Sequence, residues 1–151
     1  MTFQLSPRSI KTLTGVNQQL VEVVYHAITV SKIDFAVIEG VRTLARQREL
    51  VKQGASQTLN SKHLDGRAVD LMAYLGTRPS WELKLYDDIA DAVKEAAIKV
   101  GVGIRWGGAW TVPDITKWPG TMQAAQDSYV DLRRKQGKRI FIDAPHFELA
   151  E

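Results

Sequence analysis

The segment SKHLDGRAVD, residues 61–70, ends with an aspartate inside a short run of small and branched apolar residues. The run 68–72 has the pattern of a largely buried β-strand. A carboxylate in such a strand is costly to bury unless a cation or hydrogen-bond donors meet it. Asp70 therefore has either an ordinary buried partner or a metal ion beside it, and the fold must bring that partner to it.

A histidine close in the sequence is one candidate for a shared site with Asp70. His63 lies seven residues earlier, and Asp65 and Gly66 between them suit a sharp turn. Such a turn allows both side chains to reach one ion. On this pair alone, the plainer interpretation of a surface histidine and a satisfied buried acid is favoured.

A second cluster, IDAPHFEL at residues 142–149, strengthens the metal interpretation. It places Asp143 three residues before His146. The chain has no cysteine, so any metal must be held by histidines and carboxylates. His63, Asp70 and His146 would give zinc two nitrogens and one oxygen and leave a fourth position for water, as in catalytic zinc sites. Asp143 would then be a spare carboxylate beside that water.

The length of 151 residues, with 44% hydrophobic and 25% charged residues, predicts one globular domain spanning 1–151. Ser6 and Pro7 predict the start of a helix, and Ser80 and Gly101 predict the ends of another. Helices and strands are interspersed without the regular alternation of a doubly wound sheet, which favours a small α+β domain. Residues 6–28 are predicted to form one or two helices, and further helices are predicted at 43–54, 80–101 and 121–138. The predicted strands cover 34–41, 68–72, 102–108 and 139–149.

Two motifs together resemble a known family. Residues 61–70 match S-x-H-x-x-G-x-A-x-D in full, and residues 143–146 supply acid-x-x-His. This combination resembles the signature of the D-Ala-D-Ala metallopeptidase family, which includes the VanX and VanY enzymes. Within that family the chain most resembles the single-domain phage endolysins that cut L-alanyl-D-glutamate bonds. The resemblance extends from VIEGVRT (37–43) through GIRWGGAW (103–110) to PHFEL (145–149).

The resemblance implies a hedgehog/D-Ala-D-Ala peptidase-like fold, a mainly antiparallel sheet with helices packed on it, and no separate wall-binding domain. It also implies that His63, Asp70 and His146 are zinc ligands, that Asp143 is the general base and that Arg42 is a cation near the substrate carbonyl. Zinc lowers the pKa of bound water toward ~7 and polarises a carbonyl. A base takes the water's proton, and a cation stabilises the developing oxyanion.

The implied function is that of a phage endolysin, a zinc endopeptidase that hydrolyses the peptide stem of bacterial peptidoglycan at the L-alanyl-D-glutamate bond and causes host lysis. We expect a monomer that accumulates in the host cytoplasm and reaches the wall once the membrane is permeabilised, because no apolar stretch suits a membrane span or a secretory signal. No specific nucleic acid partner is expected.

Two alternatives remain open from the sequence. One is a D-Ala-D-Ala dipeptidase or carboxypeptidase, which needs a closed pocket for a free C-terminus. The other is a non-enzymatic module whose basic surface, with a net charge of +3, binds wall polymer or nucleic acid.

Several residues near these motifs have two interpretations. Glu148 could orient the ring of His146, but a solvated strand-end residue is favoured. Trp106 and Trp110 could line a cleft, but a core position is favoured for both. The basic run 131–139 could touch an anionic polymer, but a solvated helix face is favoured. Most of this basic run lies in the segment 111–138, which is either an insertion that faces the substrate or a surface addition without a role at the site.

Overall fold

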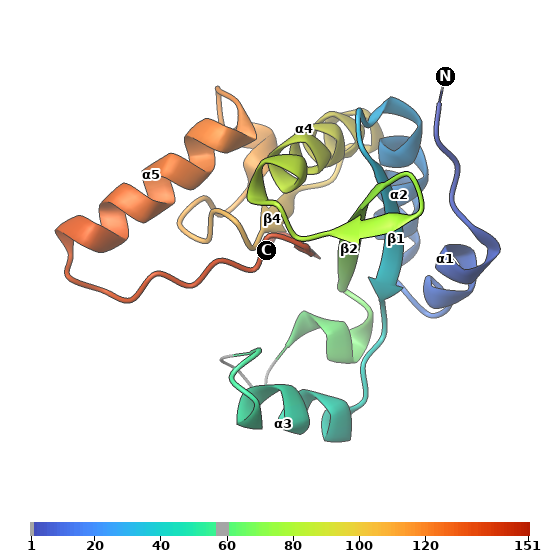
Figure 1. Ribbon diagram of the computed structural model, residues 1–151, viewed down its shortest axis with the longest axis horizontal. Coiled ribbons are helices and arrows are strands. Elements are labelled where there is room, and N and C mark those ends of the chain that lie inside the picture. The colour runs from blue at the N-terminus through green and yellow to red at the C-terminus, as the bar shows by residue number, and fades with distance from the viewer. Residues whose placement is uncertain (1, 57–60) are drawn as a thin grey trace.

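The computed structural model describes residues 2–56 and 61–151, and within them five strands form one antiparallel sheet (Figure 1). The sheet order is β1-β2-β5-β4, and β3 pairs with β2. One edge of β2 pairs with β1, while the other edge pairs first with β5 and then with β3. The strands are β1 (Asp34–Glu39), β2 (Ala68–Leu75), β3 (Arg78–Ser80), β4 (Ile104–Trp106) and β5 (His146–Leu149).

Helices surround this sheet, and α2 and α4 pack against each other within the core. In Figure 1, α3 lies beyond the end of β1, and α5 lies to one side of the sheet. The helices are α1 (Pro7–Thr12), α2 (Gln18–Val30), α3 (Leu44–Lys52), α4 (Leu83–Val100) and α5 (Met122–Lys135), with short 3₁₀ helices η1 (Lys62–Asp65) and η2 (Ile115–Lys117). The α+β class with a mainly antiparallel sheet is confirmed.

The predicted helix start at Ser6 and helix end at Gly101 are confirmed. The Ser6 side chain accepts a hydrogen bond from the Ser9 amide at 3.1 Å and caps α1. Gly101 ends α4 in the left-handed region, with φ of 89°. Ser80 was wrong as the cap of α4, because the chain pairs with β2 through Ser80 and the helix begins at Leu83. The predicted strand 139–149 forms only at His146–Leu149.

Strand β2 is largely buried, as predicted, and one of its faces is buried more completely than the other. Val69, Leu71 and Ala73 are fully buried in the core. Asp70 points to the opposite face, as alternation along a strand requires, and its side chain is 14% exposed. The carboxylate thus faces a cavity rather than the hydrophobic core.

Across the part of the chain that the structure describes, no helix has the length and apolar character needed to cross a membrane.

Candidate functional site

Three segments bring His63, Asp70 and His146 together. Asp70 and His146 are directly paired residues of the neighbouring strands β2 and β5. His63 lies on η1, where the Ser61 side chain accepts a hydrogen bond from its amide at 3.2 Å. Gly66 then turns the chain into β2 with φ of 77°, and a Cβ there would lie 2.6 Å from the carbonyl oxygen of Gly15. Only glycine suits this turn.

The outer nitrogen of each histidine ring lies beside an oxygen that accepts a hydrogen bond. The Nδ1 atom of His63 lies 2.8 Å from the carbonyl oxygen of Gly40, and Nε2 of His146 lies 2.8 Å from Oε1 of Glu148. A carbonyl oxygen can only accept, so His63 donates from Nδ1. By the same reasoning His146 donates from Nε2 to the Glu148 carboxylate. In the neutral rings the inner nitrogens, Nε2 of His63 and Nδ1 of His146, therefore carry lone pairs and no proton.

These inner lone pairs converge with a carboxylate oxygen. His63 Nε2 lies 3.0 Å from Asp70 Oδ1 and 3.2 Å from His146 Nδ1, and the latter lies 3.3 Å from Asp70 Oδ1. Three acceptors at these distances repel one another unless a positive charge lies among them. Among residues 2–56 and 61–151, these three form the only cluster with metal-binding geometry. The arrangement is a candidate metal centre.

The pKa values of Asp70 and His146 also indicate that the cluster favours a positive charge. Burial alone would raise the pKa of Asp70, but hydrogen bonds with His146 and His63 outweigh burial and hold it below its usual range. Burial alone would lower the pKa of His146, but hydrogen bonds with Asp70 and Glu148 outweigh it and raise that pKa to about 9. Without a metal, the cluster must take up a proton to become stable.

Glu148 is buried beside the cluster, so the preference for a solvated position was wrong. It is 7% exposed, accepts one hydrogen bond from His146 and forms an ion pair with Lys62 at 3.1 Å. Burial raises its pKa, but His146 and Lys62 outweigh this effect and lower it. The sequence carried a signal for this position, because residues 146 and 148 of one strand share a face.

Asp143 lies on the segment before β5 and lines the same cavity as His146. Its amide donates to the carbonyl of Gly107 at 2.9 Å, and the amide of Gly107 donates to the carbonyl of His146 at 2.9 Å. A Cβ at position 107 would lie 2.1 Å from the Asp143 carbonyl oxygen, so glycine is needed there. Burial, with the charge of Asp70 second, raises the pKa of Asp143 to about 6. A carboxylate with this pKa is suited to exchange protons near neutral pH.

Arg42 lies in the cavity wall, but most of its donors are bound within the protein. It is 8% exposed. Its Nε and Nη2 atoms bind the Glu39 carboxylate at 2.8 and 2.9 Å, and Nη1 donates to Gln47 at 2.5 Å. Nη2 also donates to Oδ2 of Asp70 at 3.1 Å. Arg42 therefore holds the Asp70 oxygen that faces away from the histidines.

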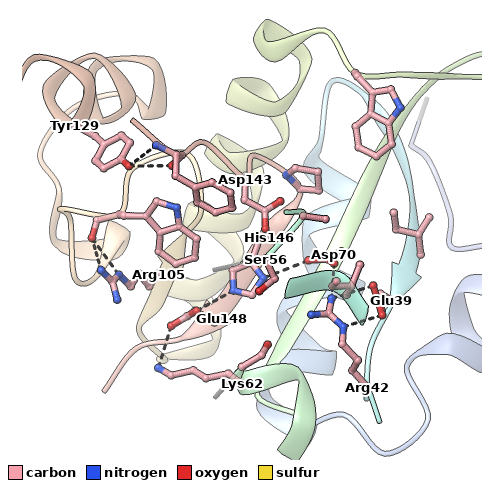
Figure 2. A pocket seen from close by; sticks show the side chains of 18 of the residues that line it. Glu39, Arg42, Ser56, Lys62, Asp70, Arg105, Tyr129, Asp143, His146 and Glu148 are labelled. Atoms are coloured by element: carbon pink, nitrogen blue, oxygen red, sulfur yellow. Dashed lines mark hydrogen bonds and ion pairs between the residues drawn. The ribbon is translucent and has the colours of Figure 1, made fainter. Parts of the chain in front are cut away.

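The cluster opens into a cavity of about 590 Å³ (Figure 2). Trp110 lines this cavity, and its ring centroid lies 5.4 Å from that of His146, so a core position alone was wrong for this residue. Trp106 is fully buried, as predicted, and its indole donates to the carbonyl of Ala144 at 2.7 Å. The site therefore combines a candidate metal centre, a spare carboxylate and room for a substrate.

Comparison with known proteins points to one family. A family model described as phage L-alanyl-D-glutamate peptidase matches residues 1–150. The L-alanyl-D-glutamate peptidase of Escherichia phage T5 is 29% identical over 114 residues, which cover 73% of this chain and 83% of that protein. The enzyme of the same name from Listeria phage A118 is 34% identical over 79 residues, which cover 52% of this chain and 27% of that protein.

A solved structure is similar over nearly the whole chain. The crystal structure of the Serratia marcescens L-Ala D-Glu endopeptidase ChiX superposes with a TM-score of 0.74 at 37% sequence identity. The match covers 99% of this chain and 91% of ChiX.

Proposed function

This chain belongs to the phage L-alanyl-D-glutamate peptidase family, and from that membership we propose that it is a zinc-dependent endopeptidase that cuts the L-alanyl-D-glutamate bond in the peptide stem of bacterial peptidoglycan. The observation that carries the proposal is the convergence of three acceptor atoms beside a spare carboxylate in one cavity. We further propose that a monomer acts through this single domain, from the host cytoplasm onto the wall.

The donor set fits zinc. Two imidazole nitrogens and one carboxylate oxygen are ligands that zinc prefers. Ligand distances of about 2.0–2.1 Å around a tetrahedral zinc ion place neighbouring ligand atoms roughly 3.3 Å apart. The three separations among His63, Asp70 and His146 are 3.0, 3.2 and 3.3 Å. Gly40 and Glu148 hold the outer ring nitrogens, which is the usual arrangement behind zinc-bound histidines.

A zinc ion held there would polarise the scissile carbonyl and acidify a water molecule. Asp143 accepts the proton of the attacking water as the new carbon–oxygen bond forms. The same carboxyl group then donates that proton to the leaving nitrogen as the carbon–nitrogen bond breaks. The raised pKa of Asp143 supports both roles, because the group must gain and lose a proton within one cycle.

Arg42 is proposed to stabilise the negative charge that develops on the carbonyl oxygen. Its guanidinium carries five N–H groups, and the four bonds to Glu39, Gln47 and Asp70 use four of them. One N–H on Nη1 has no partner among the described residues. The buried charge also acts over a short distance in a site with little water.

Digestion of isolated peptidoglycan tests the function. The purified, zinc-loaded protein should release fragments with a new N-terminal D-glutamate, identified by mass spectrometry. Released D-alanine would reassign the chain to the carboxypeptidase branch. If no new amino termini appear, while the protein is folded and contains zinc, the proposed function is wrong.

A further inference from the structure

The cavity contains positive charge that the proposed chemistry does not use. Four basic side chains line it: Arg42, Lys62, Arg105 and Arg133. The first two are neutralised by acidic residues of the site, as described above. Arg105 and Arg133, which together we call the basic wall, have no carboxylate partner among the described residues. Two uncompensated guanidinium groups in one cavity form a site for an anion.

Arg133 is held in place by the packing of α5. Tyr129 lies one turn earlier on the same helix face, and its hydroxyl exchanges hydrogen bonds with the backbone of Phe141 at 2.9 and 3.0 Å. This contact fixes α5 to the segment that leads to Asp143 (Figure 2). The Arg133 guanidinium lies 5.7 Å from the centre of the Tyr129 ring. Within the described chain it makes no hydrogen bond or ion pair, and its buried Nε has no partner.

Arg105 is held by contacts with Trp110. Its Nε and Nη2 atoms donate to the carbonyl of Trp110 at 3.1 and 2.5 Å, and the guanidinium lies 5.1 Å from the Trp110 ring centre. Trp110 in turn contacts His146. The Trp110 ring therefore lies between the Arg105 guanidinium and His146, a proposed zinc ligand. The Nη1 atom of Arg105 has no partner among the residues described.

We propose that the basic wall binds the free carboxylate of the substrate's glutamate residue and so selects the substrate and its direction in the cavity. This inference rests on the proposed function. Glutamate has two carboxyl groups, and because the peptide stem continues through one of them, the other keeps its charge. Elsewhere in the cavity the cations Arg42 and Lys62 are already paired with acidic residues, so Arg105 and Arg133 are the cations available to pair with this carboxylate. The glutamyl side of the scissile bond therefore lies toward Arg105 and Arg133.

Two matched stem peptides test the proposal. One contains D-glutamate with its free carboxylate, and in the other this group is a carboxamide of nearly the same shape. The wild-type protein should show kcat/KM about tenfold or more higher for the carboxylate peptide, the usual scale of a charge-assisted hydrogen bond. Arg133→Gln and Arg105→Gln should each reduce this ratio, and the double variant should bring it close to one. The readout is the ratio of the two peptides for each variant, so a substitution that slows both peptides equally does not count as a loss of the preference.

Arg134→Gln is the matched control, because Arg134 is the next residue on α5, is exposed and does not line the cavity. It should keep the wild-type ratio. A double variant that retains the wild-type preference overturns the proposal, as does a wild-type protein with no preference.

Binding separates this proposal from the proposed function. A D-glutamyl peptide without the scissile bond, and its carboxamide counterpart, are titrated into the zinc-loaded protein by calorimetry. Tighter binding of the carboxylate form, lost in the double variant, supports the basic wall even if neither substrate is cut, in which case the proposed function alone fails. Equal affinity of the wild-type protein for both forms overturns the basic wall.

Discussion

At the scale of single residues, Asp70 uses both of its oxygens. Oδ1 faces the two histidines, while Oδ2 accepts a hydrogen bond from Arg42 at 3.1 Å. Arg42 thus contacts the candidate metal centre through Asp70, in addition to its proposed role toward the substrate. From the sequence, Arg42 was predicted only to stabilise charge on the substrate. If that were its only role, loss of Arg42 would leave zinc in place.

Replacement of Arg42 by alanine is therefore expected to weaken zinc binding as well as turnover. Loss of a residue that orients a metal ligand typically costs about 10–100-fold in metal affinity or activity. Competition with a chelator measures zinc affinity, and peptide hydrolysis measures turnover. Arg46→Ala is the control, because Arg46 is exposed and lies 3.9 Å from Glu39 without contacting Asp70. Unchanged zinc affinity in Arg42→Ala would show that Asp70 does not need this support.

Asp143→Asn should retain zinc and lose activity by a factor of about 10² to 10⁴, the usual contribution of a general base. The amide keeps the shape of the side chain but cannot accept the proton. Loss of this base should also flatten the acid limb of the pH–rate profile. Asp131→Asn, on the exposed part of α5, is the control for removal of one negative charge. Wild-type turnover in Asp143→Asn would require a different base.

At the scale of secondary structure elements, α4 and α5 meet through acidic residues. Asp91 on α4 accepts a hydrogen bond from the amide of Met122 at 2.9 Å, at the start of α5. Asp87, one turn earlier on α4, is 8% exposed, and its Oδ1 has no hydrogen-bond partner in the described structure. Burial, followed by the charges of Asp91 and Asp127, raises the pKa of Asp87 to about 6. This interface is therefore less stable when Asp87 is ionised.

The sign of the resulting pH effect follows from linkage. The pKa of Asp87 is about 6 in the folded state against 3.8 for the ordinary group, so the folded state binds the proton more tightly. Its contribution to stability is complete below pH ~4 and is lost as the pH rises through ~6. Asp87→Asn should remove this loss and raise the free energy of unfolding at pH 7 by about 1–3 kcal/mol.

Urea unfolding at pH 4.5 and pH 7 measures this difference. The Asp87→Asn variant should gain stability over the wild-type protein at the higher pH and little at the lower one. Glu95→Gln, on the exposed side of the same helix, should show no such gain. A variant that is equally stabilised at both pH values would show that charge is not the cause.

At the scale of the whole molecule, the candidate metal centre connects segments that are far apart in the sequence. His63, Asp70 and His146 come from η1, β2 and β5. A bound ion stabilises only the folded chain, because the unfolded chain does not hold these ligands together. At a free zinc concentration of 100 times Kd, this contribution is about 2.7 kcal/mol.

Removal of zinc by a chelator should therefore lower Tm, and His63→Ala, Asp70→Ala or His146→Ala should each lose zinc and activity. Metal analysis and thermal unfolding with and without added zinc check this. His26→Ala is the control, because His26 on α2 is the one histidine of the chain outside the candidate ligand set. Full zinc content in any one ligand variant would remove that residue from the proposed ligand set.

The sequence by itself determined the parts of the molecule that depend on neighbouring residues. Caps such as Ser6 and Gly101 mark helix ends because they satisfy backbone groups within one turn. The α+β class follows from the order of these elements. The candidate ligands could also be found, because few residue types bind zinc and two short motifs, at 61–70 and 143–146, contain them.

Only the tertiary structure decided which groups meet across the chain. The burial of Glu148 against Lys62, the bond from Arg42 to Asp70 and the orientation of Arg133 toward the cavity all join segments distant in sequence. Their geometry depends on strand pairing and helix packing. A basic run on a helix has the same local pattern whether its residues meet solvent or a cavity, and the packing of α5 decides which of them, here Arg133, faces the site.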